Sequence, residues 1–277
     1  MKPYALILSN DIVNPEEMLR VTGAVRSYVD GVKIGITSSM VPGVDIFARA
    51  RDRARDDTVI LADYKVADIG FQEKDGSWNG TNEKIIRELS TSGVNYITCH
   101  TIPGISSIEE SVKTAHAHGV GVLTLPYMTH KGANLFFGMP FNNRQRKHVA
   151  LEIESYGIKK GVENQWLWND ILFKVESTTD VILALGNHFG VDGFIGPANN
   201  PDVLRRYRYF TESEIWSPGF GRQDRQGRDL ETQIREWAEV VGPNSAMIVG
   251  SLIYKANDPA AAAREVMEIR DKVVSEL

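Results

Sequence analysis

The chain has 277 residues, of which 42% are hydrophobic and 24% charged, and its 31 Lys and Arg against 36 Asp and Glu give a formal net charge of −5. A net acidic chain without a long basic run lacks the charge pattern that drives binding to nucleic acid, and no apolar run reaches the ~18 residues that cross a bilayer. Because the N-terminus is too short for a signal-peptide core and Cys99 is the single cysteine, the sequence predicts a cytoplasmic protein without a disulfide framework, without nucleic acid as a partner and without membrane contact.

Short apolar runs rich in β-branched residues alternate with helix-compatible stretches along the chain. The candidate strands are, in order, Tyr4–Ser9, Val32–Ile36, Thr58–Ala62, Val94–Cys99, Gly121–Leu125, Asp192–Ile195, Glu214–Ser217 and Ala246–Val249. The clearest candidate helices are Pro15–Tyr28, Asn82–Thr91, Ile108–Ala117, Asp229–Val241 and Pro259–Val274. This alternation predicts the α/β class and a (β/α)8 TIM barrel, whose functional groups lie at the carboxyl ends of the strands.

The length by itself allows one domain or two, because roughly 150 residues per domain would divide the chain into about two. A barrel of about 250 residues accommodates the whole length, so we predict a single TIM-barrel domain. It spans residues 1–277. Two stretches exceed ordinary connection lengths and are interpreted as insertions: the polar, Gly-rich residues near 70–80, and residues 138–190, which we expect to add one or two helices.

The most informative charged residues follow the second and third candidate strands. Asp63 and Lys65 lie two positions apart at a strand end, which places them on the same side, and Asp68 follows as the chain turns. A structural ion network or a solvated loop explains this spacing equally well. Lys33 favours a functional site, because a lysine inside an apolar strand needs an acidic partner. We expect an alternating array of Lys33, Asp63, Lys65 and Asp68, with Asp11 on the other flank.

These residues, in this order, resemble the orotidine 5′-monophosphate decarboxylase family, particularly its archaeal branch. The matching segments are Asp11, 32–35, 62–69, 81–84, 103–104, 128–130, 196–197, 217–221, 248–250 and 253–254, so the resemblance spans nearly the whole chain. Sugar-phosphate members of the superfamily, such as 3-keto-L-gulonate 6-phosphate decarboxylase and hexulose-phosphate synthase, carry a glutamate at the Lys33 position that helps to hold magnesium. An ammonium group cannot ligate a cation, so Lys33 favours the branch that uses no metal and no cofactor.

The resemblance implies decarboxylation of orotidine 5′-monophosphate to uridine 5′-monophosphate in pyrimidine biosynthesis, through a vinyl carbanion at C6. Asp63 would lie against the departing carboxylate and Lys65 would deliver the proton to C6, while Lys33 and Asp68 complete the array. In the family, the second Asp of the motif enters the site from the partner subunit. The resemblance therefore also implies a homodimer in which Asp68 and Thr81 complete the partner's site.

The remaining implied contacts are with the nucleotide substrate. Asp11 and Lys33 would contact the ribose hydroxyls and Thr129 the pyrimidine amide edge. Pro218 and Gly250 belong to the matched segments, and Gln223 lies in the loop after residues 217–221. Gln223 and the Gly250 backbone would face the phosphate.

One position departs from the family at the phosphate end. The arginine that binds phosphate should directly follow Val249 and Gly250, but Ser251 stands there. A bidentate guanidinium–phosphate pair supplies affinity and binding energy for the chemical step, so either another cation replaces it or the substrate differs. Among Arg222, Arg225 and Arg228 we expect Arg222 to compensate, because it adjoins the matched glycines, and the Ser251 hydroxyl can donate a hydrogen bond.

Two other functions stay open. A superfamily paralogue that acts on a different pyrimidine or sugar-phosphate substrate, or on one without a phosphate, would account for Ser251. A catalytically dead nucleotide-binding protein is the third interpretation. The intact Lys33, Asp63, Lys65 and Asp68 set argues against it, because binding alone gives no reason to keep a carboxylate that destabilises the bound substrate.

Overall fold

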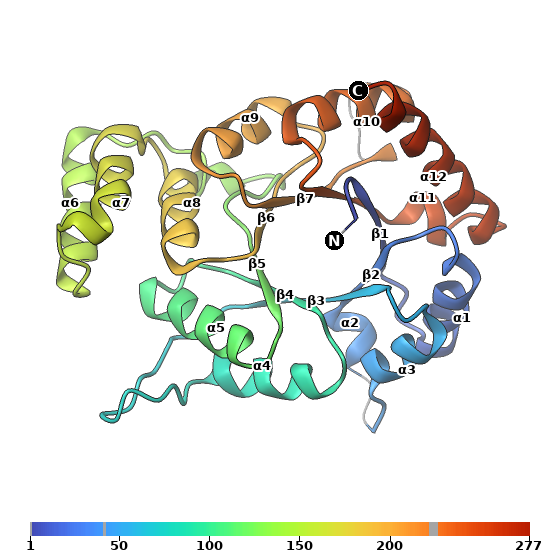
Figure 1. Ribbon diagram of the computed structural model, residues 1–277, viewed down its shortest axis with the longest axis horizontal. Helices are drawn as coiled ribbons and strands as arrows, with labels where there is room; N and C mark the ends of the chain where they lie inside the picture. Colours follow the sequence, from blue (N-terminus) through green and yellow to red (C-terminus); the bar gives the residue numbers. More distant parts are fainter. Residues whose placement is uncertain (1, 41–42, 222–226) are drawn as a thin grey trace.

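The structure is a computed structural model that describes residues 2–40, 43–221 and 227–277. In this part of the chain, eight parallel strands close into a barrel in which each strand pairs with the next and β8 pairs with β1 (Figure 1). The strands are β1 (Ala5–Asn10), β2 (Gly31–Gly35), β3 (Val59–Val66), β4 (Tyr96–Cys99), β5 (Gly121–Thr124), β6 (Gly193–Ile195), β7 (Glu214–Pro218) and β8 (Ser245–Val249). The predicted TIM barrel is confirmed, and every predicted strand is present.

Helices surround the barrel (Figure 1). They are α1 (Pro15–Val25), α2 (Ile36–Ser39), α3 (Ile46–Arg53), α4 (Thr81–Thr91), α5 (Ile105–Ala117), α8 (Thr178–Phe189), α9 (Pro201–Phe210), α10 (Leu230–Val241), α11 (Ser251–Tyr254) and α12 (Pro259–Ser275). The starts of α1 and α12 follow one rule: Asn14 and Asp258 cap the free N–H groups, and a proline fills the first helical position. All the helices predicted from the sequence are present, and none in the described part of the chain is long and apolar enough to cross a membrane.

Alternate residues of the strands fill the interior of the barrel. The inward-facing apolar cluster consists of Ala5, Ile7, Leu61, Leu123, Trp216, Ala246 and Ile248. The other face of each strand packs against the helices and forms the larger core. Continuing the same alternation to the carboxyl ends of the strands brings polar side chains inward, among them Ser9, Lys33, Asp63 and Thr98.

Strand β3 runs to Val66, beyond the end predicted at Ala62. Ala62 pairs with Ile97 and Val66 with Cys99, so β3 advances by 66 − 62 = 4 residues where β4 advances by 99 − 97 = 2. This bulge contains Lys65, whose φ of 49° is in the left-handed region. Bulges are known to redirect a side chain at an active site, and this one interrupts the regular alternation within the charged motif.

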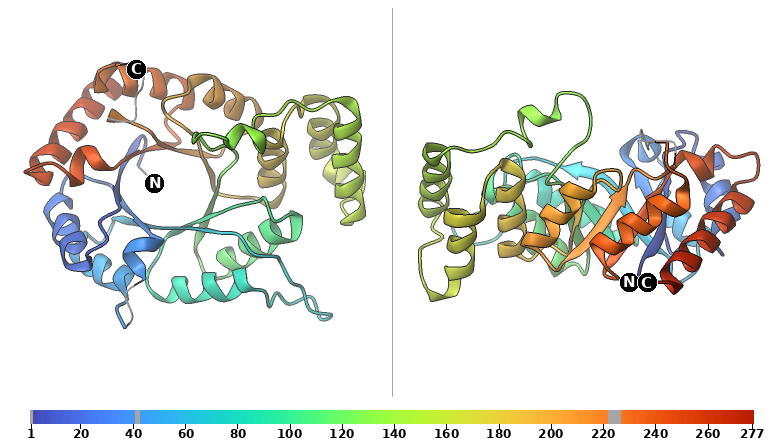
Figure 2. Two further views of the ribbon diagram at one scale, coloured as in Figure 1. Left: turned by 180° about the vertical axis from the view of Figure 1, so that it is seen from behind. Right: turned by 90° about the horizontal axis from the view of Figure 1, so that it is seen from above.

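Most of the two long stretches interpreted as insertions lies outside the barrel, whereas α8, at the end of residues 138–190, belongs to the helices that surround it. Residues 138–190 contain α6 (Asn143–Ser155), η2 (Val162–Asn164), α7 (Gln165–Asn169) and η3 (Asp170–Lys174), and α6 and α7 lie beyond α8, away from the barrel (Figures 1 and 2). Residues near 70–80 form a projecting hairpin in which Gln72 pairs with Trp78. The segment between β5 and α6, which contains η1 (Ala133–Leu135), rises at the edge of the barrel opposite the chain termini (Figure 2, right).

Candidate active site

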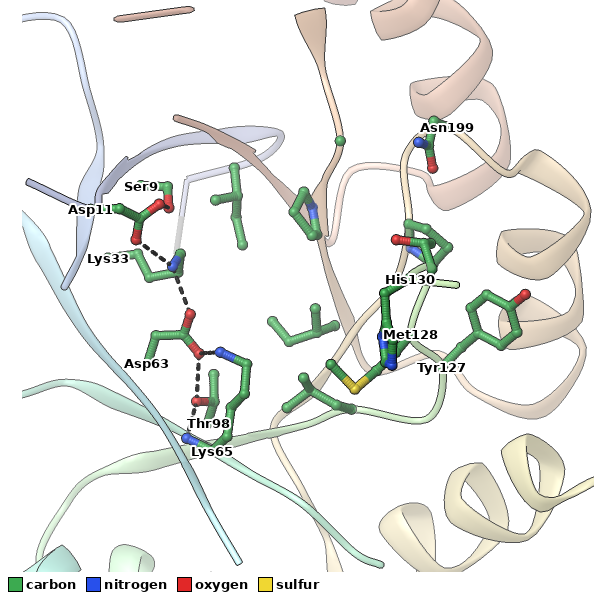
Figure 3. Close-up of a pocket in the computed structure, with 17 residues that line it drawn as sticks. Ser9, Asp11, Lys33, Asp63, Lys65, Thr98, Tyr127, Met128, His130 and Asn199 are labelled. Carbon is green, nitrogen blue, oxygen red and sulfur yellow. Dashed lines mark hydrogen bonds and ion pairs between the residues drawn. The ribbon is translucent and has the colours of Figure 1, made fainter. Parts of the chain in front are cut away.

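A cavity of about 330 Å³ lies at the carboxyl ends of the strands, where TIM-barrel enzymes hold their functional groups (Figure 3). Of the residues predicted from the sequence, those that line it are Asp11, Lys33, Asp63, Lys65, Thr129 and Pro218. Those that line it without having been predicted are Ser9, Thr98, Leu125, Tyr127, Met128, His130, Ile195, Pro197, Asn199, Gly219 and Ile248.

The Asp63 carboxylate lies between two ammonium groups. Lys33 Nζ is 2.6 Å from Asp63 Oδ2, and Lys65 Nζ is 2.7 Å from Asp63 Oδ1 (Figure 3). Lys33 also lies 3.4 Å from Asp11 Oδ1, on the side away from Asp63. Neighbouring strands β2 and β3 thus bring together charges that are 30 positions apart in the chain. The result is a continuous series of opposite charges from Asp11 to Lys65.

Burial and charge act in opposite directions on this series. Burial alone would raise the pKa of Asp63, but Lys33 and Lys65 reverse this effect and hold that pKa well below the usual range. Burial alone would lower the pKa of Lys33, but Asp63 and then Asp11 outweigh it and raise that pKa. Asp63 is therefore an ionised carboxylate at neutral pH, and Lys33 is a fixed positive charge.

Two hydroxyl residues support the series. Thr98 Oγ1 donates to Asp63 Oδ1 at 2.9 Å and accepts from the backbone N–H of Lys65, also at 2.9 Å. Ser9 Oγ donates to Asp11 Oδ2 at 2.9 Å. Neither of these two residues was predicted from the sequence. Strand alternation was the available signal, because Ser9 follows inward-facing Ala5 and Ile7, and Thr98 follows Tyr96.

The rest of the cavity wall comes from loops that follow β5 and β6. Tyr127, Met128 and His130 belong to the segment after β5, and Asn199 to the segment after β6. These side chains lie across the cavity from the Asp11, Lys33, Asp63 and Lys65 series (Figure 3). One wall is therefore charged and built on strands, whereas the other is aromatic, polar and built on loops.

Comparison with known proteins agrees with this geometry. Residues 4–266 match the family described as "Orotidine 5'-phosphate decarboxylase / HUMPS family". The chain belongs to this family. Relatives named "Orotidine 5'-phosphate decarboxylase" include a Methanococcoides burtonii protein, 26% identical over 96% of this chain and 97% of its own length, and a Methanosarcina mazei protein, 26% identical over 95% and 93%.

Solved structures support the same fold. The orotidine 5'-monophosphate decarboxylase of Methanocaldococcus jannaschii, complexed with the inhibitor BMP, has a TM-score of 0.69 at 20% identity, and the alignment covers 98% of this chain and 100% of the other. The orotidine 5'-phosphate decarboxylase of Pyrococcus horikoshii has a TM-score of 0.65 at 20% identity, over 96% and 99%. The family resemblance read from the sequence is confirmed.

Asp68 and Thr81 do not reach this cavity within one chain. Both are exposed, at the two ends of the hairpin. The Asp68 N–H donates to Asn82 Oδ1 at 3.0 Å, and Asp68 Oδ1 accepts from the Ile69 N–H at 2.7 Å. The array expected from the sequence is thus formed in this chain by Lys33, Asp63 and Lys65, because the chain turns outward after β3 and takes Asp68 with it.

Glu110 of α5 holds both ends of this hairpin. Its Oε1 accepts from the backbone N–H of Gly80 at 2.7 Å and of Phe71 at 3.5 Å. Gly80 packs so closely against the carboxylate that a Cβ there would lie 2.4 Å from Oε1. Burial raises the pKa of Glu110 against the effect of these N–H donors, and the Glu83 and Asp68 carboxylates raise it further. The hairpin base is therefore fixed to α5 through one buried carboxyl group.

The residues predicted to bind the phosphate lie after β7 and β8, and some of them fall outside the described residues. Gly250 and Ser251 stand at the start of α11, next to the cavity residue Ile248, but neither lines the cavity. Arg222 and Gln223 lie outside the described residues, as does Arg225. Arg228 pairs with Glu236 on α10, in a separate depression between α9 and α10. Of the three loop arginines, Arg228 thus forms an ion pair with a carboxylate of its own chain, away from the cavity.

Proposed function

We propose that this protein decarboxylates orotidine 5′-monophosphate to uridine 5′-monophosphate without a metal or cofactor. The observation that carries the proposal is the Asp63 carboxylate, held between Lys33 and Lys65 at the base of the cavity. Family membership and the names of the relatives agree with this activity.

The proposed step breaks the bond between C6 of the pyrimidine and its carboxylate carbon. Carbon dioxide leaves, the electron pair stays on C6, and Lys65 Nζ transfers a proton to that carbon. Asp63 repels the substrate carboxylate in the ground state, and this repulsion disappears as carbon dioxide forms, so the fixed charges favour the transition state. Lys65 can recover its proton from water, because its side chain is 39% exposed.

The position of Lys33 supports a reaction without a metal. Its ammonium group occupies the side of the Asp63 carboxylate that faces β2, at a direct contact distance of 2.6 Å. A divalent cation bound to Asp63 on that side would meet a fixed positive charge, which opposes its binding. Lys33 thus does electrostatically what a cation would do, and it keeps Asp63 ionised.

The same cavity gives the substrate an orientation. We assign the ribose hydroxyls to Asp11 and Lys33, the pyrimidine amide edge to Thr129, and the neighbouring wall to Pro218, because all four line the cavity. The phosphate is assigned to the β7 and β8 end. The groups that we assign to it are the Gly250 backbone, the Ser251 hydroxyl, and Gln223 and Arg222, which lie outside the described residues.

We further propose a homodimer in which Asp68 and Thr81 of one chain complete the cavity of the other. Their exposure at the base of the hairpin supports this arrangement. It is testable by mixing Lys65→Ala and Asp68→Ala proteins after reversible dissociation. Random pairing makes about half of the dimers heterodimers, and each heterodimer contains one complete site and one that lacks both side chains. About a quarter of all sites should therefore be active. A mixture no more active than the separate variants would contradict shared sites.

A spectrophotometric assay decides the activity. Purified protein should consume orotidine 5′-monophosphate, with loss of its absorbance and formation of uridine 5′-monophosphate. Because Ser251 replaces the expected arginine, one alternative function is a decarboxylase for a substrate with a different distal group or without a phosphate. No turnover of orotidine 5′-monophosphate, together with turnover of a related carboxylate, would favour this alternative. Tight binding of uridine 5′-monophosphate with no turnover would favour a dead nucleotide-binding protein.

A further inference from the structure

We propose that Thr98 is a positioning residue that fixes Lys65 relative to Asp63. The inference rests on the proposed function, because it concerns the placement of the group that would protonate the substrate. Thr98 is 1% exposed and lies in β4, beside the bulge of β3. Its side chain contacts both the main chain of Lys65 and the carboxylate of Asp63 (Figure 3).

The direction of these hydrogen bonds is determined by their chemistry. An ionised Asp63 can only accept, so the hydroxyl hydrogen of Thr98 points to Oδ1. An oxygen lone pair of the same hydroxyl then accepts the Lys65 N–H. Lys65 Nζ contacts the same Oδ1 at 2.7 Å, so the side chain of Lys65 reaches this oxygen directly and its main chain is linked to it through Thr98. Thr98 therefore closes a ring of contacts that sets where Nζ can lie.

The local backbone needs this support. Lys65 has a Cβ and a φ of 49°, a conformation that residues other than Gly, Asn and Asp adopt rarely. Such a conformation persists only where the surroundings fix it. The bulge also removes regular ladder pairing between Ala62 and Val66, so the Lys65 N–H depends on the Thr98 oxygen as its acceptor.

The experiment separates the hydroxyl group from the shape of the side chain. Thr98→Val keeps the shape and removes the hydroxyl, and it should lower kcat for orotidine 5′-monophosphate by about 10- to 100-fold, as expected for a displaced reacting group. KM should change less than about threefold, because the loss affects the chemical step. Thr98→Ser keeps the hydroxyl and should restore most of kcat.

A matched control lies on the next strand. Thr124 of β5 is also fully buried, but its Oγ1 has no hydrogen-bond partner among the described residues. Thr124→Val should therefore leave kcat and KM at wild-type values. If it lowers kcat as much as Thr98→Val does, the effect of Thr98 is general packing, and the proposed role is wrong.

Amide hydrogen exchange at Lys65 provides a readout that does not need activity. The Lys65 N–H should exchange slowly in the wild type and in Thr98→Ser, and quickly in Thr98→Val. Fast exchange in the wild type, or slow exchange with full kcat in Thr98→Val, would overturn the inference. If the wild type does not decarboxylate orotidine 5′-monophosphate but the exchange pattern is found, the proposed function fails while the positioning of Lys65 by Thr98 stands.

Discussion

The two ends of the cavity are built in different ways. At one end, Asp11, Lys33, Asp63 and Lys65 come from the strands β1 to β3 or their ends, and each contacts a partner of opposite charge. At the other end, the predicted phosphate residues Gly250 and Ser251 follow β8 at the start of α11 without lining the cavity, and the resemblance implies an arginine where Ser251 stands. Among the described residues that line the cavity, the lysines lie only at the first end. The strands thus fix the charges that we propose for bond breaking, whereas recognition of the distal part of the substrate is proposed for the segments after β7 and β8.

The largest effect is expected at the strand end. Lys65→Ala should lower kcat by about 10⁴-fold or more, because the proposed proton donor to C6 and one of the charges beside Asp63 are both lost. Steady-state and single-turnover assays with orotidine 5′-monophosphate measure this change. Lys74→Ala, at the exposed turn of the hairpin, is the matched control and should leave kcat unchanged. A Lys65→Ala protein with kcat within about tenfold of the wild type would exclude Lys65 as the proton donor.

Removal of the central charge should also affect stability. Asp63→Asn leaves Lys33, whose side chain is 11% exposed, beside Lys65 without its main counter-charge, and should lower the free energy of unfolding by about 3 kcal/mol at pH 7. Chemical denaturation measures this difference, and Asp52→Asn on the surface of α3 is the control.

The difference in stability between the wild type and Asp63→Asn should depend on pH in a definite direction. The pKa of Asp63 is lower in the folded protein than in the unfolded chain. The contribution of Asp63 to the free energy of unfolding is therefore fully present at any pH above the pKa of an ordinary carboxyl group. The difference between wild type and Asp63→Asn should therefore shrink as the pH falls below about 4. A difference that stays constant down to low pH would show that Asp63 is not held ionised by its neighbours.

A smaller effect is expected at the loop end. Arg222→Ala should raise KM for orotidine 5′-monophosphate by about 10- to 100-fold, which corresponds to one charge-assisted hydrogen-bond pair. Arg228→Ala is the control, because Arg228 pairs with Glu236. An unchanged KM in Arg222→Ala would show that Arg222 does not replace the missing phosphate arginine, and would favour a substrate with a different distal group.

The smallest effect is expected at the hairpin, which is remote from the cavity of its own chain. Glu110→Ala removes the acceptor of the Gly80 N–H and should lower kcat by about tenfold or less, through displacement of Asp68 and Thr81. Glu110→Gln keeps an acceptor and should retain most activity. Amide exchange at Gly80 gives an independent measure, and slow exchange in Glu110→Ala would mean that another group holds the hairpin base.

Much of the fold could be predicted because its signals are local. Pro15 and Pro259 mark helix starts together with their capping residues, and β-branched runs mark the strands. The end of β3 was predicted at Ala62, four residues before its actual end at Val66. The reason is that Asp63 and Lys65 have low strand propensity. Pairing with β4 and the polar interior of the barrel mouth outweigh that propensity.

The sequence singled out the charged residues Asp11, Lys33, Asp63 and Lys65 that meet in the cavity, but not the neutral residues that support them. An ammonium group inside an apolar strand needs an acidic partner, so the sequence marked Lys33 as a site residue. Thr98 and Ser9 are common strand residues, and their roles depend on neighbours that the sequence does not reveal. Tyr127, Met128, His130 and Asn199 come from loops, for which the sequence contains no periodic signal. Glu110 is a helix residue whose partners lie at the two ends of a hairpin.

The sequence by itself determined the alternation of strands and helices, the family and the charged motif, because these depend on residue type and spacing along the chain. Only the tertiary structure decided that Asp63 lies between Lys33 and Lys65, that Thr98 links the Lys65 main chain to the Asp63 carboxylate, and that Asp68 does not line the cavity of its own chain. The reason is that strand register, the bulge in β3 and the packing of α5 against the hairpin depend on contacts between distant segments, and no local pattern encodes them.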